Sequence, residues 1–86
     1  MPDPVIDEAW ENMQQLVRDE AKKLVDDFPN FPAETMTSPV IAEQFCQMPA
    51  PQDTNEVLLR QLAMTSTMSI FSNTRLSLSM RAMYRR

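Results

Sequence analysis

The stretch that decides the fold is PVIDEAWENMQQLVRDEAKKLVDDF, residues 4–28. Its apolar residues recur at steps of three and four, which is the spacing of one face of an α-helix. This stripe consists of Ile6, Trp10, Met13, Val17, Ala21, Leu24 and Phe28. Asp3 suits the N-cap, Pro4 suits the first helical position, and Pro29 ends the helix. We therefore predict a long amphipathic helix over 4–28.

Two acids, Asp26 and Asp27, stand at the C-terminal end of this helix. The helix dipole disfavours negative charge at that end. Lys22 and Lys23, four residues earlier, can compensate for it. The alternative is that the two acids face a basic partner segment.

A proline-rich connector follows over 29–52. Ser38-Pro39 has the pattern of an N-cap followed by a first-turn proline, and Pro49 closes the segment. This pattern predicts a short helix over 39–48. We expect the connector to pack back on the first helix.

The third helical segment begins after a capping box formed by Asp53 and Glu56. We predict a helix over 54–71 whose apolar residues cover more than one face. A helix that is apolar over most of its girth is buried inside something. Because 86 residues offer little to bury it, this segment is the main indication of self-association or of a partner.

Beyond this segment the helical pattern weakens, because residues 65–79 include eight serines and threonines. These residues are unfavourable in helix interiors. We predict a break near 72–73 and a basic tail over 74–86, for which helix is favoured over strand because an isolated strand has nothing to pair with. The fold class predicted for 1–86 is a single small all-α domain.

The composition excludes several kinds of chemistry. With no glycine there is no phosphate-binding glycine loop, and with no histidine there is no serine–histidine pair and no cysteine–histidine zinc site. The single cysteine, Cys46, is predicted to be a small buried hydrophobe, and the acids Asp7, Glu8 and Glu11 a solvated helix start. We predict no enzyme activity and no catalytic, cofactor-binding or metal-binding residues.

Charge is unevenly distributed along the chain. All twelve acids and three bases lie between Asp3 and Glu56, which gives that part a net charge of −9. From Val57 onward there are five arginines and no acid, a net charge of +5. The chain therefore has an acidic front and a basic tail.

These features favour a non-enzymatic interaction or assembly subunit that associates with copies of itself or with a larger protein complex. The apolar helix would supply the buried surface, and the arginines would set the orientation. The predicted interface residues are Leu58, Leu59, Arg60, Leu62, Met64, Met68, Phe71, Arg75, Arg81, Arg85 and Arg86.

Two alternatives remain open. The first alternative is a nucleic-acid-binding accessory protein, because arginines such as those of the tail can contact phosphates and Tyr84 can stack on a base. The other is a small acidic inhibitor that presents the first helix to a basic target. No signal peptide or membrane-spanning segment is visible, so we expect a cytoplasmic protein or a component of a macromolecular assembly.

Residues 49–86 have a layout in which Pro51-Gln52-Asp53 precedes Leu58-Leu59 and a helical tail. This layout is similar to that of the needle and inner-rod subunits of export machines. The likeness rests on no specific motif. It implies two helical segments around a proline-bearing turn and polymerisation through the C-terminal one.

Overall fold

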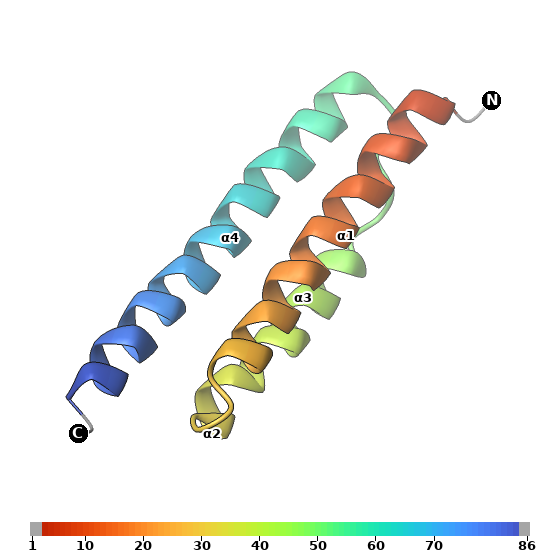
Figure 1. The fold of residues 1–86 in the computed structure, drawn as a ribbon. Coiled ribbons are helices and arrows are strands. Elements are labelled where there is room, and N and C mark those ends of the chain that lie inside the picture. Colours follow the sequence, from red (N-terminus) through yellow and green to blue (C-terminus); the bar gives the residue numbers. More distant parts are fainter. Residues whose placement is uncertain (1–2, 85–86) are drawn as a thin grey trace.

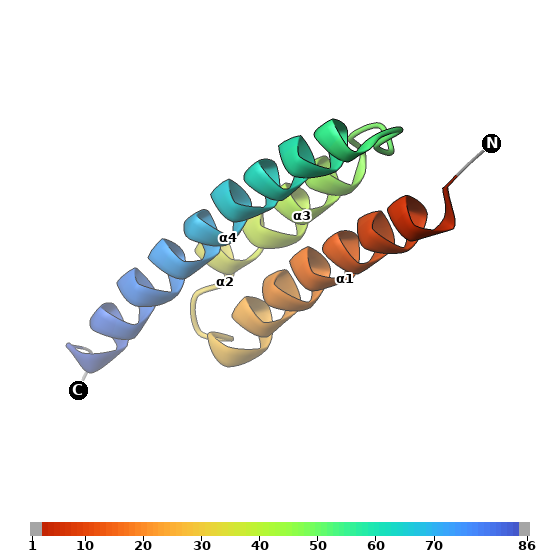
Figure 2. The ribbon, with the colours of Figure 1, turned by 90° about the horizontal axis from the view of Figure 1, so that it is seen from above.

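The structure is a computed structural model that describes residues 3–84. It contains four helices, α1 (Pro4–Asp27), α2 (Pro32–Thr35), α3 (Thr37–Cys46) and α4 (Thr54–Met83), and no strand within that range. The predicted all-α fold class is confirmed. α1 runs in one direction, α2 and α3 return beside it, and α4 runs again in the direction of α1 (Figures 1 and 2).

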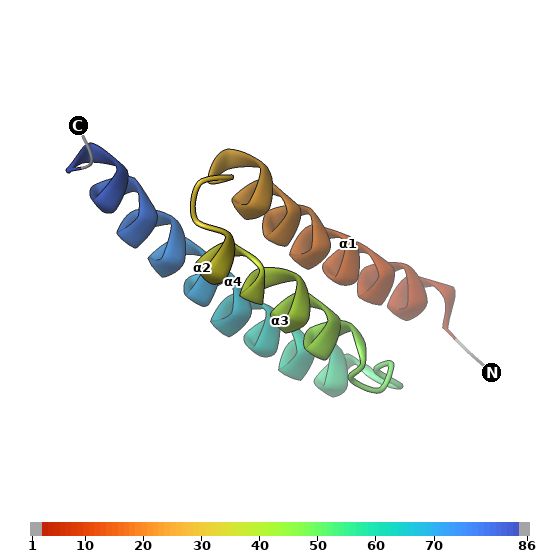
Figure 3. The same ribbon diagram turned by 90° about the horizontal axis from the view of Figure 1, so that it is seen from below.

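The molecule is a rod of 57 × 16 × 16 Å. Its radius of gyration is 15.0 Å, whereas a compact chain of this length would have about 12 Å. α1 and α4 begin at the same end, and the last turns of α4 extend past the end of α1 (Figures 2 and 3). A narrow rod has little interior, so much of each long helix stays at the surface.

α1 begins and ends for the reasons found in its sequence. The Asp3 carboxylate accepts a hydrogen bond of 2.9 Å from the Val5 amide, and Pro4 is the first helical residue. The helix ends at Asp27, one residue before the predicted end. Phe28 leaves the helical conformation because it precedes Pro29.

The connector differs from its prediction, which placed one helix over 39–48 with Ser38 as its N-cap. α3 begins at Thr37 and ends at Cys46, and α2 precedes it directly. Ser38 is buried inside the helical segment, where its hydroxyl lies 2.6 Å from Thr35 O and 3.2 Å from Ala21 O of α1. Because α2 already supplies the turn before α3, no N-cap is needed there, and Ser38 joins α3 to α1 instead.

α4 is one continuous helix of 30 residues, so the predicted break near 72–73 is wrong. The threonine hydroxyls bond within the helix, as when Thr74 donates to Ile70 O at 2.9 Å. The buried side chains of Phe71 and Leu78 lie on either side of the expected break and hold both halves against the core. The segment after residue 74 is helical through Met83, as favoured over strand, and residues 85–86 lie outside the described range.

The core is centred on α1. Its buried residues are Trp10, Met13, Val17, Ala21 and Leu24, and the Trp10 ring lies 5.2 Å from that of Phe45 on α3. α1 packs extensively against both α3 and α4, whereas α3 and α4 contact each other much less. α4 contributes only Phe71 and Leu78 to the fully buried set. Most of its surface therefore faces away from the rest of the chain.

Candidate interaction surface

The side of α4 turned away from α1 and α3 is the main candidate surface, which we call the outward face. Its apolar members are Leu58, Leu59, Leu62, Leu76, Met80 and Met83, with exposed fractions from 51% to 76%. Between the two ends of this face lie the exposed polar residues Thr65, Ser66, Ser69, Ser72 and Asn73. The face therefore has an apolar patch near each end and a centre of mostly small polar side chains.

This face is uncharged along nearly its whole length. Among the exposed residues of α4 from Leu58 to Met83, Arg81 alone is charged, and it points towards α2. Water-facing helix surfaces usually carry charged residues. A long uncharged surface with exposed leucines and methionines is typical of a binding surface.

Only some of the predicted interface residues lie on this face. Leu58, Leu59 and Leu62 do. Phe71 is 3% exposed, and Met64 and Met68 are half-buried against the core. The prediction that these last three contact a partner does not fit their positions.

The predicted interface residues lie on different sides of α4 because successive residues of an α-helix are rotated by about 100°. This rotation places Met64 nearly opposite Leu62, so the same helix presents one to the core and the other to solvent. The apolar residues around α4 are therefore divided between a side buried against the core and the outward face.

Arg75 was expected at a partner interface, but its guanidinium contacts the same chain. Its Nη1 lies 2.7 Å from Asp27 Oδ2, and the guanidinium stacks 5.6 Å from the Phe28 ring centre. The unfavourable acid at the C-terminal end of α1 is thus opposed by a base from α4. This ion pair attaches α4 to α1.

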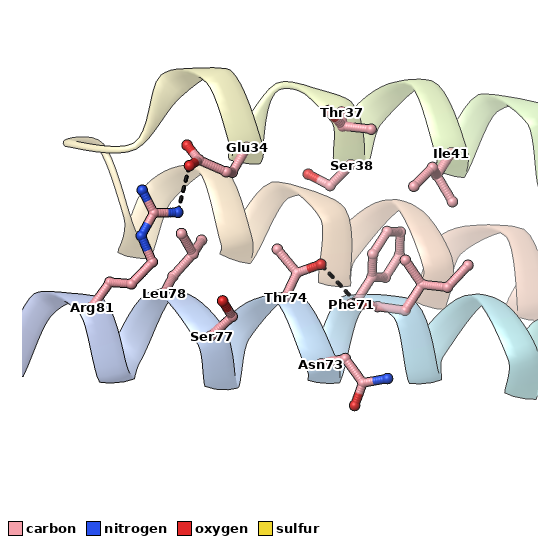
Figure 4. Close-up of a pocket in the computed structure, with 11 residues that line it drawn as sticks. Glu34, Thr37, Ser38, Ile41, Phe71, Asn73, Thr74, Ser77, Leu78 and Arg81 are labelled. Carbon is pink, nitrogen blue, oxygen red and sulfur yellow. Dashed lines mark hydrogen bonds and ion pairs between the residues drawn. The ribbon is translucent and has the colours of Figure 1, made fainter.

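Arg81 makes a similar attachment further along α4. Its Nη1 donates to Glu34 Oε1 (Figure 4). The guanidinium also lies 5.1 Å from the Phe31 ring centre. Arg75 and Arg81 thus both have acidic partners within the chain, in ion pairs that remain partly exposed to solvent. The predicted interface residues Arg85 and Arg86 lie outside the described range.

Arg60 holds the beginning of α4. Its Nε donates to Pro49 O at 2.9 Å, and its guanidinium lies 6.0 Å from the Trp10 ring centre. Three arginines of α4 therefore each combine an acceptor with an aromatic ring of the same chain. Sequence reasoning missed these partners, since Asp27 and Glu34 lie 48 and 47 residues from their arginines.

A shallow open groove of about 450 Å³ runs between α4 and the α2–α3 segment (Figure 4). Ile41, Ile70, Phe71 and Leu78 supply its apolar lining. Arg81 and Glu34 close one end. The other polar side chains along it are hydroxyl and amide groups such as Thr37, Asn73 and Ser77.

The titratable and metal-ligating side chains offer little reactivity. Burial raises the pKa of the Cys46 thiol; Arg18 opposes this shift and Glu43 adds to it. The Cys46 thiol, whose Sγ lies 4.0 Å from Gln14 O, therefore stays protonated at neutral pH. Within residues 3–84 no group of three histidine, cysteine or acidic side chains is placed to hold a metal ion.

Comparison of the chain with models of protein families, with curated proteins and with solved structures gave no match. The similarity in layout to needle and inner-rod subunits is thus not accompanied by a structural match. None of the helices in the described range combines the length and apolar character needed to cross a bilayer.

Proposed function

We propose that this chain is a non-enzymatic protein–protein interaction subunit that binds through the outward face of α4. One observation supports this proposal above the others. Six large apolar side chains, each at least 51% exposed, lie along one face about 38 Å long, and Arg81, which points away, is the single charged residue among its exposed neighbours. Covering such a face removes apolar area from water, which favours association by roughly 25 cal/mol per Å².

The arginines have a different role in this proposal from the one expected from the sequence. Arg60, Arg75 and Arg81 hold α4 on α1 and on the connector, so that the outward face stays presented as one straight surface. The partner then contacts leucines and methionines more than charges. Its binding should consequently depend only weakly on salt.

The test is site-specific photocrosslinking in cells that produce the protein. A benzophenone-bearing amino acid replaces Leu62 on the outward face or, as the matched control, Leu16 on the outer side of α1. Both leucines are more than half exposed, at 65% and 51%. We expect a protein adduct from position 62 that disappears when Leu58→Glu and Leu59→Glu are added, and little or none from position 16.

Absence of any adduct at position 62 in a protein with unchanged helix content would overturn the proposal. Equal adducts from positions 62 and 16 would show that the outward face is not distinguished from the rest of the surface. The mass of a specific adduct then reports whether the occupant is another copy of this chain or a larger protein.

A further inference from the structure

Four apolar members of the outward face lie symmetrically about Ser69, whereas Leu59 and Met83 have no apolar counterpart at the same distance on the other side. Leu62 and Leu76 each lie seven residues from Ser69, and Leu58 and Met80 each lie eleven. Seven and eleven residues correspond to about two and about three turns, so these five side chains share one line along the helix. Apolar side chains therefore lie at equal distances on either side of a small polar centre.

From this symmetry we propose that a second copy of the chain covers the face, packed antiparallel across a twofold axis at Ser69. This inference rests on the proposed function and names its partner. In a twofold contact, residue i meets residue j and j meets i. Leu62 of one copy meets Leu76 of the other, and Leu58 meets Met80, so apolar patches cover each other at both ends.

The centre of the face suits a close crossing of two helices. Ser66, Ser69 and Ser72 are small, and the distance between packed helix axes depends on the side chains at the contact. The Thr65 hydroxyl already donates to Gln61 O at 3.0 Å within its own helix. Burying this hydroxyl against another copy therefore leaves it with its acceptor.

Charge favours antiparallel over parallel packing. At the end where α1 and α4 begin, the acids Asp3, Asp7, Glu8, Glu11, Asp53 and Glu56 outnumber the single base Arg60. At the other end the bases Lys22, Lys23, Arg75 and Arg81 are nearly balanced by the acids Asp26, Asp27 and Glu34. Antiparallel copies therefore place each acid-rich end beside a nearly neutral end, whereas parallel copies place acids beside acids.

The size of the face predicts a weak dimer. A strip about 38 Å long, from Leu58 to Met83, and about 10 Å wide covers roughly 380 Å² on each copy. The total of about 760 Å² is below the usual range for stable complexes. The dimer should therefore form reversibly and depend on concentration in the micromolar range.

Disulfide crosslinking tests both the partner and its direction. The variants Ser69→Cys, Leu62→Cys and Leu76→Cys are each made together with Cys46→Ser and oxidised mildly. We expect Ser69→Cys to form a disulfide-linked dimer alone and a mixture of Leu62→Cys with Leu76→Cys to form a mixed one. Leu62→Cys alone should not, because the axis separates the two positions by about 21 Å in antiparallel copies.

Sedimentation of the unsubstituted chain gives an independent measurement, in case a variant folds poorly. A dimer fraction that rises with concentration, and falls after Leu62→Glu but not after Leu16→Glu, supports the inference. Dimers of Leu62→Cys as abundant as those of Ser69→Cys would instead show parallel packing and overturn it.

A monomer at every concentration, with no disulfide from any variant, would also overturn the inference. The proposed function would then be decided separately by the adducts at position 62. An adduct with a larger protein would retain the function and exclude the second copy, whereas no adduct would exclude both.

Discussion

α1 and α4 are both long helices and run in the same direction, but they use their surfaces differently. α1 buries one full stripe and exposes charged residues such as Glu8, Glu11 and Asp19. α4 buries only Phe71 and Leu78 over 30 residues and exposes leucines and methionines. The two helices thus differ most on their outer sides, where α1 exposes charged residues and α4 exposes mainly apolar and uncharged polar ones.

The strongest test of this comparison substitutes one residue on each helix. Trp10→Ala removes a buried ring that packs on Phe45, and it should lower the free energy of unfolding by about 3–5 kcal/mol. Leu62→Ala on the outward face should change it by less than about 0.5 kcal/mol in dilute solution. Urea unfolding followed by circular dichroism measures both. Equal losses would mean that the outward face belongs to the core.

A second pair of variants compares the two sides of α4 at neighbouring positions. Leu78 is 1% exposed and Leu76 is 61% exposed. Leu78→Ala should lower the free energy of unfolding by about 2–5 kcal/mol, whereas Leu76→Ala should leave it nearly unchanged. Thermal melts at low protein concentration give both values. A large loss from Leu76→Ala alone would contradict the placement of these two faces.

The ion pair that attaches α4 to α1 through Arg75 should contribute less to stability than the buried side chains do. A double-mutant cycle with Arg75→Gln and Asp27→Asn should give a coupling free energy of about 0.2–1 kcal/mol, since both side chains are partly exposed. The coupling should shrink in high salt. As the control, Arg75→Lys retains the charge but loses much of the stacking on Phe28. Coupling that is unchanged by salt would argue against an ion pair.

The smallest expected effect concerns the packing of α3 on α1 at Cys46. Because burial raises its pKa above the ordinary value of 9.0, the folded protein holds the thiol proton more tightly than the unfolded one. The free energy of unfolding should therefore not depend on this thiol below about pH 9, and it should fall slightly as the pH rises from there through the raised pKa of the folded protein. Cys46→Ala should remove that part of the pH dependence. Alkylation as fast in the folded as in the unfolded protein would show that the thiol is not protected.

Local patterns predicted the helices well where a single segment determines them. The stripe of α1 and its caps at Asp3 and Pro29 are local features, and the predicted end was wrong by one residue. The sequence wrongly predicted a break in α4 because the low helix propensity of serine and threonine is a local property. The burial of Phe71 and Leu78 that outweighs it depends on the other helices. Ser38 was assigned as a cap for the same reason, since its second acceptor, Ala21 O, lies 17 residues away.

The candidate surface was predictable only in part. An excess of apolar residues over 57–71 indicated that some of them would be exposed, and Leu58, Leu59 and Leu62 are. Which side of α4 remains exposed depends on where α1 and α3 pack. The sequence alone therefore could not distinguish Met64, Met68 and Phe71, which face the core, from the three exposed leucines. The acidic partners of Arg75 and Arg81 needed the three-dimensional fold as well.

The ion pairs that hold the far end of α4 also determine how that end opens. Leu78 is the last fully buried side chain of α4, and beyond it Arg81 contacts Glu34 and Phe31. The amide hydrogens of the final turn should therefore exchange with solvent through local opening, at free energies far below that of global unfolding. Salt should accelerate this exchange, while the amides around Phe71 remain protected.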